Sequence, residues 1–207
     1  LYGFDKAKQA IRKENAAVLV EGQMDLVLSH QSGVTNTVAS SGTALTRDHL
    51  VLIKRLADTL IIAFDADDAG LSASKKGVDL ALSEGFDVRV AEIPAGLDPA
   101  DMALKDPEGW KKSVLNARHI IDFYLKALSG KGYDMRTFRK KTSELVLPYI
   151  AKLRNTIDQA HFVSETARAL HLSEEPIWEE LKKLGGNEKT NSTSQEYERS
   201  SEKNIPP

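Results

Sequence analysis

The chain has 207 residues, with 28 Lys and Arg against 30 Asp and Glu, five His, no Cys and 41% hydrophobic residues, enough for one medium domain or two small ones. The net charge of −2 excludes a purely electrostatic, histone-like nucleic-acid binder, so any contact with nucleic acid must rest on local charge or on metal ions. The lack of Cys excludes a disulfide framework and a Cys-based zinc module, and without an apolar leader or a run of ~20 apolar residues we expect a cytoplasmic protein with no membrane span.

Short β-rich runs alternate with helical patterns over the first hundred residues, which predicts an α/β fold with a parallel sheet. A short helix from Asp5 to Lys13, with Asp5 as its N-cap, comes first. Thr46 is the expected N-cap of a later helix, and Gly85 is the glycine expected to end another. The four expected strands are Ala17 to Glu21, Asn36 to Ala39, Thr59 to Asp65 and Asp87 to Ile93, and the helices between them are Leu26 to Gln31, Thr46 to Leu56 and Ala69 to Ser83.

Amphipathic helical spacing replaces the strand pattern from about Asp106 onward and predicts a second, all-helical unit. One long helical pattern runs from Thr137 to Leu153, with a kink expected at Pro148. We therefore divide the chain into a leading segment (residues 1–15), an α/β domain (16–105), a helical bundle (106–185) and a disordered polar tail (186–207). Positions 1–104 hold 10 basic and 15 acidic residues, whereas positions 105–185 hold 15 basic and 11 acidic ones, which suits a cation site in the first part.

Four carboxylates follow predicted strands at the ends where open α/β sheets bind their ligands. Glu21 closes the first strand, Asp65 closes the third with Asp67 two residues later, and Asp98 follows the fourth. Carboxylates gathered at one edge repel one another unless a divalent cation binds, and oxygen ligands without His or Cys favour Mg²⁺ or Mn²⁺ over zinc. Each acid taken alone is more often a helix N-cap or a solvated loop residue, so their joint placement carries the prediction.

Two further acids and one loop fall near the same edge. Asp25 comes about one helical turn after the acid of the first strand, and Asp101 comes three residues after the acid that follows the fourth. A small-residue loop after the second strand suits either close approach to a phosphate or nucleotide or a tight turn into the next helix. The residues of this loop are Ser41, Gly42 and Thr43.

Four short motifs stand in a fixed order along the α/β part: Val20-Glu21-Gly22-Gln23-Met24-Asp25, Ser41-Gly42-Thr43-Ala44-Leu45-Thr46, Phe64-Asp65-Ala66-Asp67-Asp68-Ala69-Gly70 and Leu97-Asp98-Pro99-Ala100-Asp101. In order and spacing they resemble the Toprim domain of bacterial DnaG-type primases. The match covers about half of the chain directly, and the helices that follow look like the bundle that completes the primase polymerase core. The resemblance implies a Toprim fold with a four-stranded, mainly parallel sheet flanked by helices, followed by an all-α bundle.

The resemblance also implies a function. Primases of this family are nucleotidyltransferases that make short RNA primers from ribonucleoside triphosphates on a single-stranded DNA template during replication, with Mg²⁺ or Mn²⁺ as cofactor. Carried over by position, Glu21, Asp65 and Asp67 would be catalytic metal ligands and Asp98 a further one. No side-chain nucleophile is required, because such chemistry rests on positioning and charge neutralisation, and Glu21 would alternatively assist proton transfer.

Several parts of such primases have no counterpart in this sequence. These are the zinc-binding module, which would hold the family's zinc, the basic subdomain and the C-terminal domain that binds the replicative helicase. Because the chain opens with Leu1 and ends in a polar tail, we expect it to be a piece of a longer protein. Alone, it should bind divalent metal and at most nucleotide, and it should synthesise little or no primer.

Three positions depart from the family pattern. Gln23 stands where Tyr is usual, Ala66 stands where Gly separates the paired acids, and Asp101 falls one residue late. Two other interpretations stay open: another Toprim enzyme, either a metal-dependent nuclease or a topoisomerase, and a non-catalytic module that docks onto replication proteins. A basic cluster in the helical part is interpreted as a solvated helix face rather than a template contact; it consists of Arg136, Arg139, Lys140 and Lys141.

Overall fold

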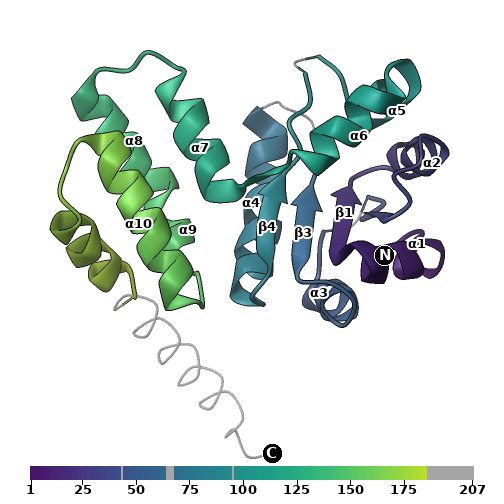
Figure 1. The fold of residues 1–207 in the computed structure, drawn as a ribbon, viewed down its shortest axis with the longest axis horizontal. Helices are drawn as coiled ribbons and strands as arrows, with labels where there is room; N and C mark the ends of the chain where they lie inside the picture. The colour runs from purple at the N-terminus through teal and green to yellow at the C-terminus, as the bar shows by residue number, and fades with distance from the viewer. Residues whose placement is uncertain (43, 64–67, 95, 186–207) are drawn as a thin grey trace, which may run out of the picture. The chain divides into compact units, whose positions relative to one another are not determined.

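The computed structural model describes residues 1–42, 44–63, 68–94 and 96–185, with the backbone alone for residues 68–75. The chain divides into two compact units, Leu1–Phe123 and the part from Tyr124 onward (Figure 1). The first unit contains the sheet, and the second is helical. Within the described ranges, none of the helices has the length and hydrophobicity needed to cross a membrane. The predicted disordered tail, residues 186–207, lies outside the described residues.

A mixed sheet forms the centre of the first unit. In the described residues it has five strands, in the order β2-β1-β3-β4-β5. They are β1 (Ala16–Val20), β2 (Thr37–Ala39), β3 (Thr59–Ile62), β4 (Asp87–Val90) and β5 (Arg118–His119). The first four pair in parallel, and β5 pairs antiparallel with β4. The predicted mainly parallel sheet is therefore confirmed, and the structure adds a fifth strand that is too short to show an alternating sequence pattern.

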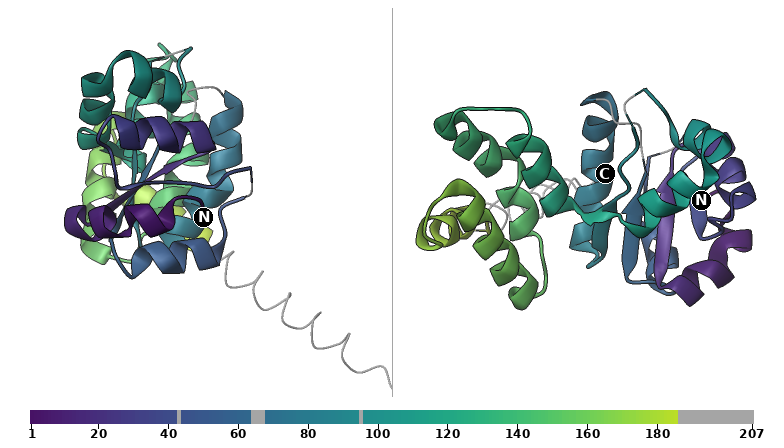
Figure 2. Two further views of the ribbon diagram at one scale, coloured as in Figure 1. Left: turned by 90° about the vertical axis from the view of Figure 1, so that its right-hand side faces the viewer. Right: turned by 45° about the horizontal axis from the view of Figure 1, so that its top comes forward.

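Helices cover both faces of this sheet (Figure 2). They are α1 (Phe4–Glu14), α2 (Gln23–Gln31), α3 (Arg47–Lys54), α4 (Asp68–Ser83), α5 (Pro99–Lys105) and α6 (Pro107–Leu115). β1 leads through α2 to β2 on one side, whereas β3 leads through α4 to β4 on the other. Right-handed crossovers in opposite directions place α2 and α4 on opposite faces. α5 packs against α2, and α6 packs against α5.

The strands bury both of their faces, as parallel strands covered on two sides do. On one face, Val18 and Ile61 belong to a cluster with Leu26 of α2 and Trp110 of α6. Leu19, the chain neighbour of Val18, is buried on the other face. α6 is therefore part of the core of the first unit, although its residues fall within the range assigned to the helical bundle on sequence grounds.

Helix ends follow two of the predicted signals and depart from a third. Thr46 caps α3 through its side chain, and Gly85 follows α4 with φ of +81°, so both predictions are confirmed. The prediction of Asp5 as the N-cap of α1 is wrong, because the helix already begins at Phe4. Its N-cap is Gly3, with φ of +75°, a conformation that glycine adopts without the strain a side chain would cause.

The second unit begins within α7 (Ile120–Ser129) and continues through α8 (Met135–Leu145), α9 (Leu147–Ala151), α10 (Thr156–Leu170) and a helix at residues 175–185. Where the sequence predicts one long helix kinked at Pro148, the structure has two helices that separate at Val146. Pro148 lies in the first turn of α9, where its missing N–H would have no helical partner. Phe138 and Phe162 are buried.

The basic cluster of the second unit serves mainly local contacts. The guanidinium of Arg139 donates from Nε and Nη2 to the Leu170 carbonyl, at 3.2 and 3.1 Å, and so closes the carboxyl end of α10. Lys140 and Lys141 lie 3.9 and 3.8 Å from the carboxylate of Glu144. These contacts support the interpretation of this cluster as a helix face rather than as a nucleic-acid site.

Candidate functional site

The strand order reverses between β1 and β3, and ligands of open α/β sheets bind outside the carboxyl ends of the strands at such a point. Glu21 follows β1 directly, and its side chain is exposed. β3 is the neighbouring strand, with Ile62 opposite Leu19 of β1. Glu21 therefore lies at the reversal point, at the edge where the sequence predicts the metal ligands.

The loop after β2 is fastened to the end of β1. The Ser41 backbone N–H donates to the Glu21 carbonyl at 2.8 Å. The Gln23 amide donates to Ser41 Oγ at 2.9 Å, so the residue that replaces the usual Tyr joins the start of α2 to this loop. Ser41 and Gly42 both have positive φ, 54° and 76°, which keeps the chain in a tight turn at this edge. Thr43, the third residue of the predicted loop, lies outside the described residues.

Asp25 joins two helices at the same edge. Its Oδ2 accepts the Gly22 N–H at 2.9 Å and closes the first turn of α2, while its Oδ1 accepts the Ala100 N–H of α5 at 3.1 Å. Burial raises the pKa of Asp25, and the nearby charge of Asp98 adds to this, although the two N–H donors favour the ionised form. Because both oxygens of Asp25 are engaged within the chain, this acid holds α5 against α2.

Replacing Asp25 by Asn is expected to lower the free energy of unfolding by about 1 kcal/mol near neutral pH, because the amide retains only one acceptor. The raised pKa of Asp25 adds a pH dependence that the variant lacks. Since the folded chain binds this proton more tightly than the unfolded chain, the stability of the parent relative to Asp25→Asn should increase as pH falls through the raised pKa. Urea unfolding of both chains at several pH values measures the difference, and a constant difference would contradict this account.

Asp98 and Asp101 lie at the start of α5. Asp98 caps this helix, with its Oδ1 accepting the Asp101 N–H at 2.6 Å, and its side chain is exposed. Within the described residues its second oxygen makes no hydrogen bond. The carboxylate of Asp101 lies 3.1 Å from Lys105 Nζ, one turn further along. Capping therefore leaves Asp98 an oxygen for a cation, whereas Asp101 already has a cationic partner.

The described residues do not by themselves complete a metal site. Asp65 and Asp67 lie outside them, in the segment between β3 and α4. Among the side chains that the structure describes, no three of His, Asp and Glu gather closely enough to hold a metal ion. Glu21 and Asp98 supply carboxylate oxygens, the donor type that Mg²⁺ and Mn²⁺ take in proteins. The chemistry of the donor set thus fits these ions, with Asp65 and Asp67 needed to complete it.

Two contacts at this edge have no local sequence signal. Asp25 meets Ala100 across 75 positions of the chain, and Tyr2 pairs with Ala39 in an antiparallel bridge. The bond between Gly22 and Asp25 does have a signal, because an acid three residues after an N-cap has the spacing of a capping box. Because Gly22 has no side chain, only the acid's half of such a box can form here, and the sequence gives a partial signal for capping by Asp25.

The chain is similar to known proteins in sequence and in structure. A family model described as Toprim-like matches residues 18–103. The DNA primase of Halalkalibacterium halodurans is 39% identical over 183 residues, which cover 87% of this chain and 31% of that protein. The chain thus spans about a third of the length of the curated relatives it matches.

Solved structures resemble the chain beyond its sheet. The Aquifex aeolicus primase, solved with its zinc-binding and RNA polymerase domains, has a TM-score of 0.72 and 26% identity over 84% of this chain and 42% of that one. A DnaG primase catalytic domain bound to single-stranded DNA has a TM-score of 0.69 and 27% identity, over 84% of this chain and 57% of that one. The first unit ends at Phe123. A match over 84% of the chain is longer than this unit, so both matches extend into the helical unit.

Proposed function

Because the chain belongs to the family of bacterial DnaG-type primases, over a Toprim-like domain and the helices that follow it, we propose that it forms part of the RNA polymerase core of a DNA primase. The reaction is nucleotidyl transfer on a single-stranded DNA template. The 3′-hydroxyl of the RNA primer attacks the α-phosphate of an incoming ribonucleoside triphosphate, and pyrophosphate leaves. The likeness to a DnaG catalytic domain bound to single-stranded DNA supports this template.

The main structural support for this proposal is the position of Glu21. It is an exposed carboxylate at the carboxyl end of β1, beside β3, where the strand order reverses. Its backbone carbonyl also accepts a hydrogen bond from the Ser41 N–H, so an acid and a small-residue turn lie at the same edge. Nucleotidyl transfer needs this combination, because the phosphates of a nucleotide must approach carboxylates closely while divalent cations offset the repulsion between them.

We assign Glu21, Asp65 and Asp67 as the residues that would hold Mg²⁺ or Mn²⁺, with Asp98 as a further ligand. When bound, such ions stabilise negative charge on the phosphates and lower the pKa of the attacking hydroxyl. The remaining residues position these groups. Asp25 keeps α5, and with it Asp98, against α2, and the fastened turn at Ser41 leaves room for a phosphate because Gly42 carries no side chain.

A chimera tests this function. The matching segment of the Halalkalibacterium halodurans primase is replaced by this chain, so that the relative supplies the parts that the chain does not span. With a single-stranded DNA template, ribonucleoside triphosphates and Mn²⁺, the chimera should make short RNA products, and EDTA should abolish them. The isolated chain should make little or none.

The control is the relative's own segment reinserted through the same junctions. A chimera that melts like this control but makes no RNA would overturn the proposal. Cleavage of the template without RNA synthesis would instead support a Toprim nuclease.

A further inference from the structure

Tyr2 is an exposed aromatic residue on a fixed backbone. Its N–H donates to the Ala39 carbonyl at 2.9 Å, and the Ala39 N–H donates to the Tyr2 carbonyl at 3.1 Å. The side chain of Tyr2 is nevertheless 47% exposed. A single exposed aromatic ring is common in folded proteins, so its surroundings decide whether it has a ligand.

The surroundings of Tyr2 are those of the candidate site. Ala39 is the last residue of β2, and the next two residues, Ser40 and Ser41, donate backbone hydrogen bonds to the end of β1 at 3.1 and 2.8 Å. The second of these bonds ends on Glu21. Tyr2 therefore lies at the same carboxyl edge as Glu21, and its bridge partner Ala39 comes two positions before Ser41 of the small-residue loop.

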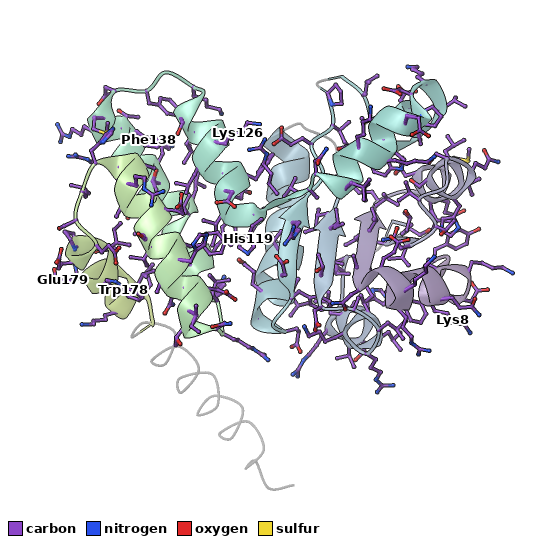
Figure 3. All side chains as sticks on the ribbon, in the orientation of Figure 1. Lys8, His119, Lys126, Phe138, Trp178 and Glu179 are labelled. Atoms are coloured by element: carbon purple, nitrogen blue, oxygen red, sulfur yellow. The ribbon has the colours of Figure 1, made fainter. Side chains whose placement is uncertain are left out.

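Several basic side chains follow Tyr2 on the flanks of the first helix. α1 starts two residues later and carries four exposed basic side chains, which are Lys6, Lys8, Arg12 and Lys13. The buried residues of this helix are Ala7 and Ile11, one turn apart, so the cations occupy its other sides. Figure 3 shows Lys8 on the outer side of α1. Lys6 and Lys13 are seven residues apart, which is about 10 Å along the helix.

Most of the other basic residues of the first unit whose side chains are described have an acidic partner. Ion pairs of 2.7 to 3.1 Å engage six of the others, namely Arg47, Lys54, Arg89, Lys105, Lys111 and Arg118. In the part of the chain that the structure describes, no ion pair includes a cation of α1. α1 carries these four cations against two acids, Asp5 and Glu14, so it is net positive within an otherwise acidic unit and attracts an anionic polymer.

We propose that Tyr2 and α1 bind single-stranded nucleic acid, with one base stacked on the Tyr2 ring and phosphates following the cations of the helix. This inference rests on the proposed function, which requires a single strand at this edge, and it specifies how the strand is held. A base can stack on a side chain only where it is free of a duplex. An acidic protein partner would use the cations but not the adjacent ring, so the pairing of the two features favours a nucleic acid.

Fluorescence anisotropy of the 207-residue chain with a labelled oligothymidylate of about twelve nucleotides tests the proposal, in EDTA so that no divalent cation takes part. Tyr2→Ala should weaken binding about tenfold, as should Tyr2→Leu, because neither side chain offers a ring for stacking. Tyr2→Phe should bind like the parent. Thermal melting of each variant verifies that the fold is intact.

The role of the cations is measured by salt dependence. Lys6→Gln/Arg12→Gln should weaken binding and reduce the slope of log affinity against log salt by about 1.4, which is about 0.7 for each of the two cations on a single strand. The matched control is Arg55→Gln/Lys112→Gln, which removes two exposed cations outside α1 and should leave the slope unchanged. An equal loss in the two double variants would overturn the assignment to α1.

An abasic oligonucleotide separates stacking from charge. Tyr2→Ala should bind this probe as tightly as the parent, because there is no base to stack. The proposal is overturned if the parent fails to bind oligothymidylate at low salt, or if Tyr2→Ala binds it as well as the parent does. Primer synthesis by the chimera is an independent readout, so binding through Tyr2 without synthesis would refute the proposed function and leave this site standing.

Discussion

Replacing Asp65 and Asp67 together by Asn is expected to weaken Mn²⁺ binding to this chain by about 100-fold or more. Asn preserves the size of each side chain but removes its charge, and Mn²⁺ and Mg²⁺ bind chiefly through carboxylate oxygens. Loss of a residue that merely supports a metal ligand already costs 10- to 100-fold in affinity. Glu21 and Asp98 are only two acids, and no third His, Asp or Glu of the described residues joins them to form a metal site. They should therefore not retain the ion.

Calorimetric titration of the parent and the double variant measures this effect. The matched control is Asp5→Asn/Asp48→Asn, which removes the same charge from exposed positions on α1 and α3 and should bind Mn²⁺ like the parent. If the parent and the Asp65/Asp67 variant bound Mn²⁺ equally weakly, the strand-end acids would be caps and surface charges. That result would favour a docking module over a metal-dependent enzyme.

Replacing Trp110 by Ala is expected to lower the free energy of unfolding of the first unit by about 3–5 kcal/mol. Trp110 is fully buried, in the cluster that joins α6 to α2 and the sheet. Among the described residues its indole Nε1 has no hydrogen-bond acceptor. Trp110→Phe should therefore cost less than about 2 kcal/mol, because it retains a ring and removes a buried donor that lacks a partner.

Urea unfolding followed by circular dichroism measures both variants. Leu115→Ala is the matched control, because Leu115 lies on the same helix but is 81% exposed and should change stability by less than about 0.5 kcal/mol. Once Trp110 is replaced, Trp178 is the remaining tryptophan, and its fluorescence reports the second unit. A cost for Trp110→Ala as small as that of the control would show that α6 does not belong to the first core.

The sequence is most informative where a structural requirement spans only a few residues. The first strand is predicted at Ala17 to Glu21 and found at Ala16–Val20, because a run of apolar residues marks a buried strand wherever it occurs. Thr46 is recognisable as an N-cap because its hydroxyl binds an N–H only three residues away. The positions of the acids directly after the strands can be predicted from the same local pattern. The pattern does not reveal which of these acids form hydrogen bonds or ion pairs with other residues of the chain.

Two predictions fail or fall short because distant residues decide them. The first helix begins at Phe4 rather than after Asp5, since Gly3 turns the chain directly after Tyr2 pairs with β2. The kink expected at Pro148 becomes a break at Val146 between α8 and α9. In both cases the local signal is real, but packing and strand pairing set where the helix starts or stops.

The sequence by itself determined the α/β class, the parallel strands and the family resemblance, because apolar periodicity, caps and short motifs are properties of neighbouring residues. Only the tertiary structure decided that α6 packs in the first core, that a two-residue β5 ends the sheet, and that Asp25 reaches Ala100. It also paired Tyr2 with Ala39 at the end of β2. Such contacts depend on how whole helices and strands pack together. The free energy that favours one packing arrangement comes from apolar burial summed over the chain, so no short segment determines it.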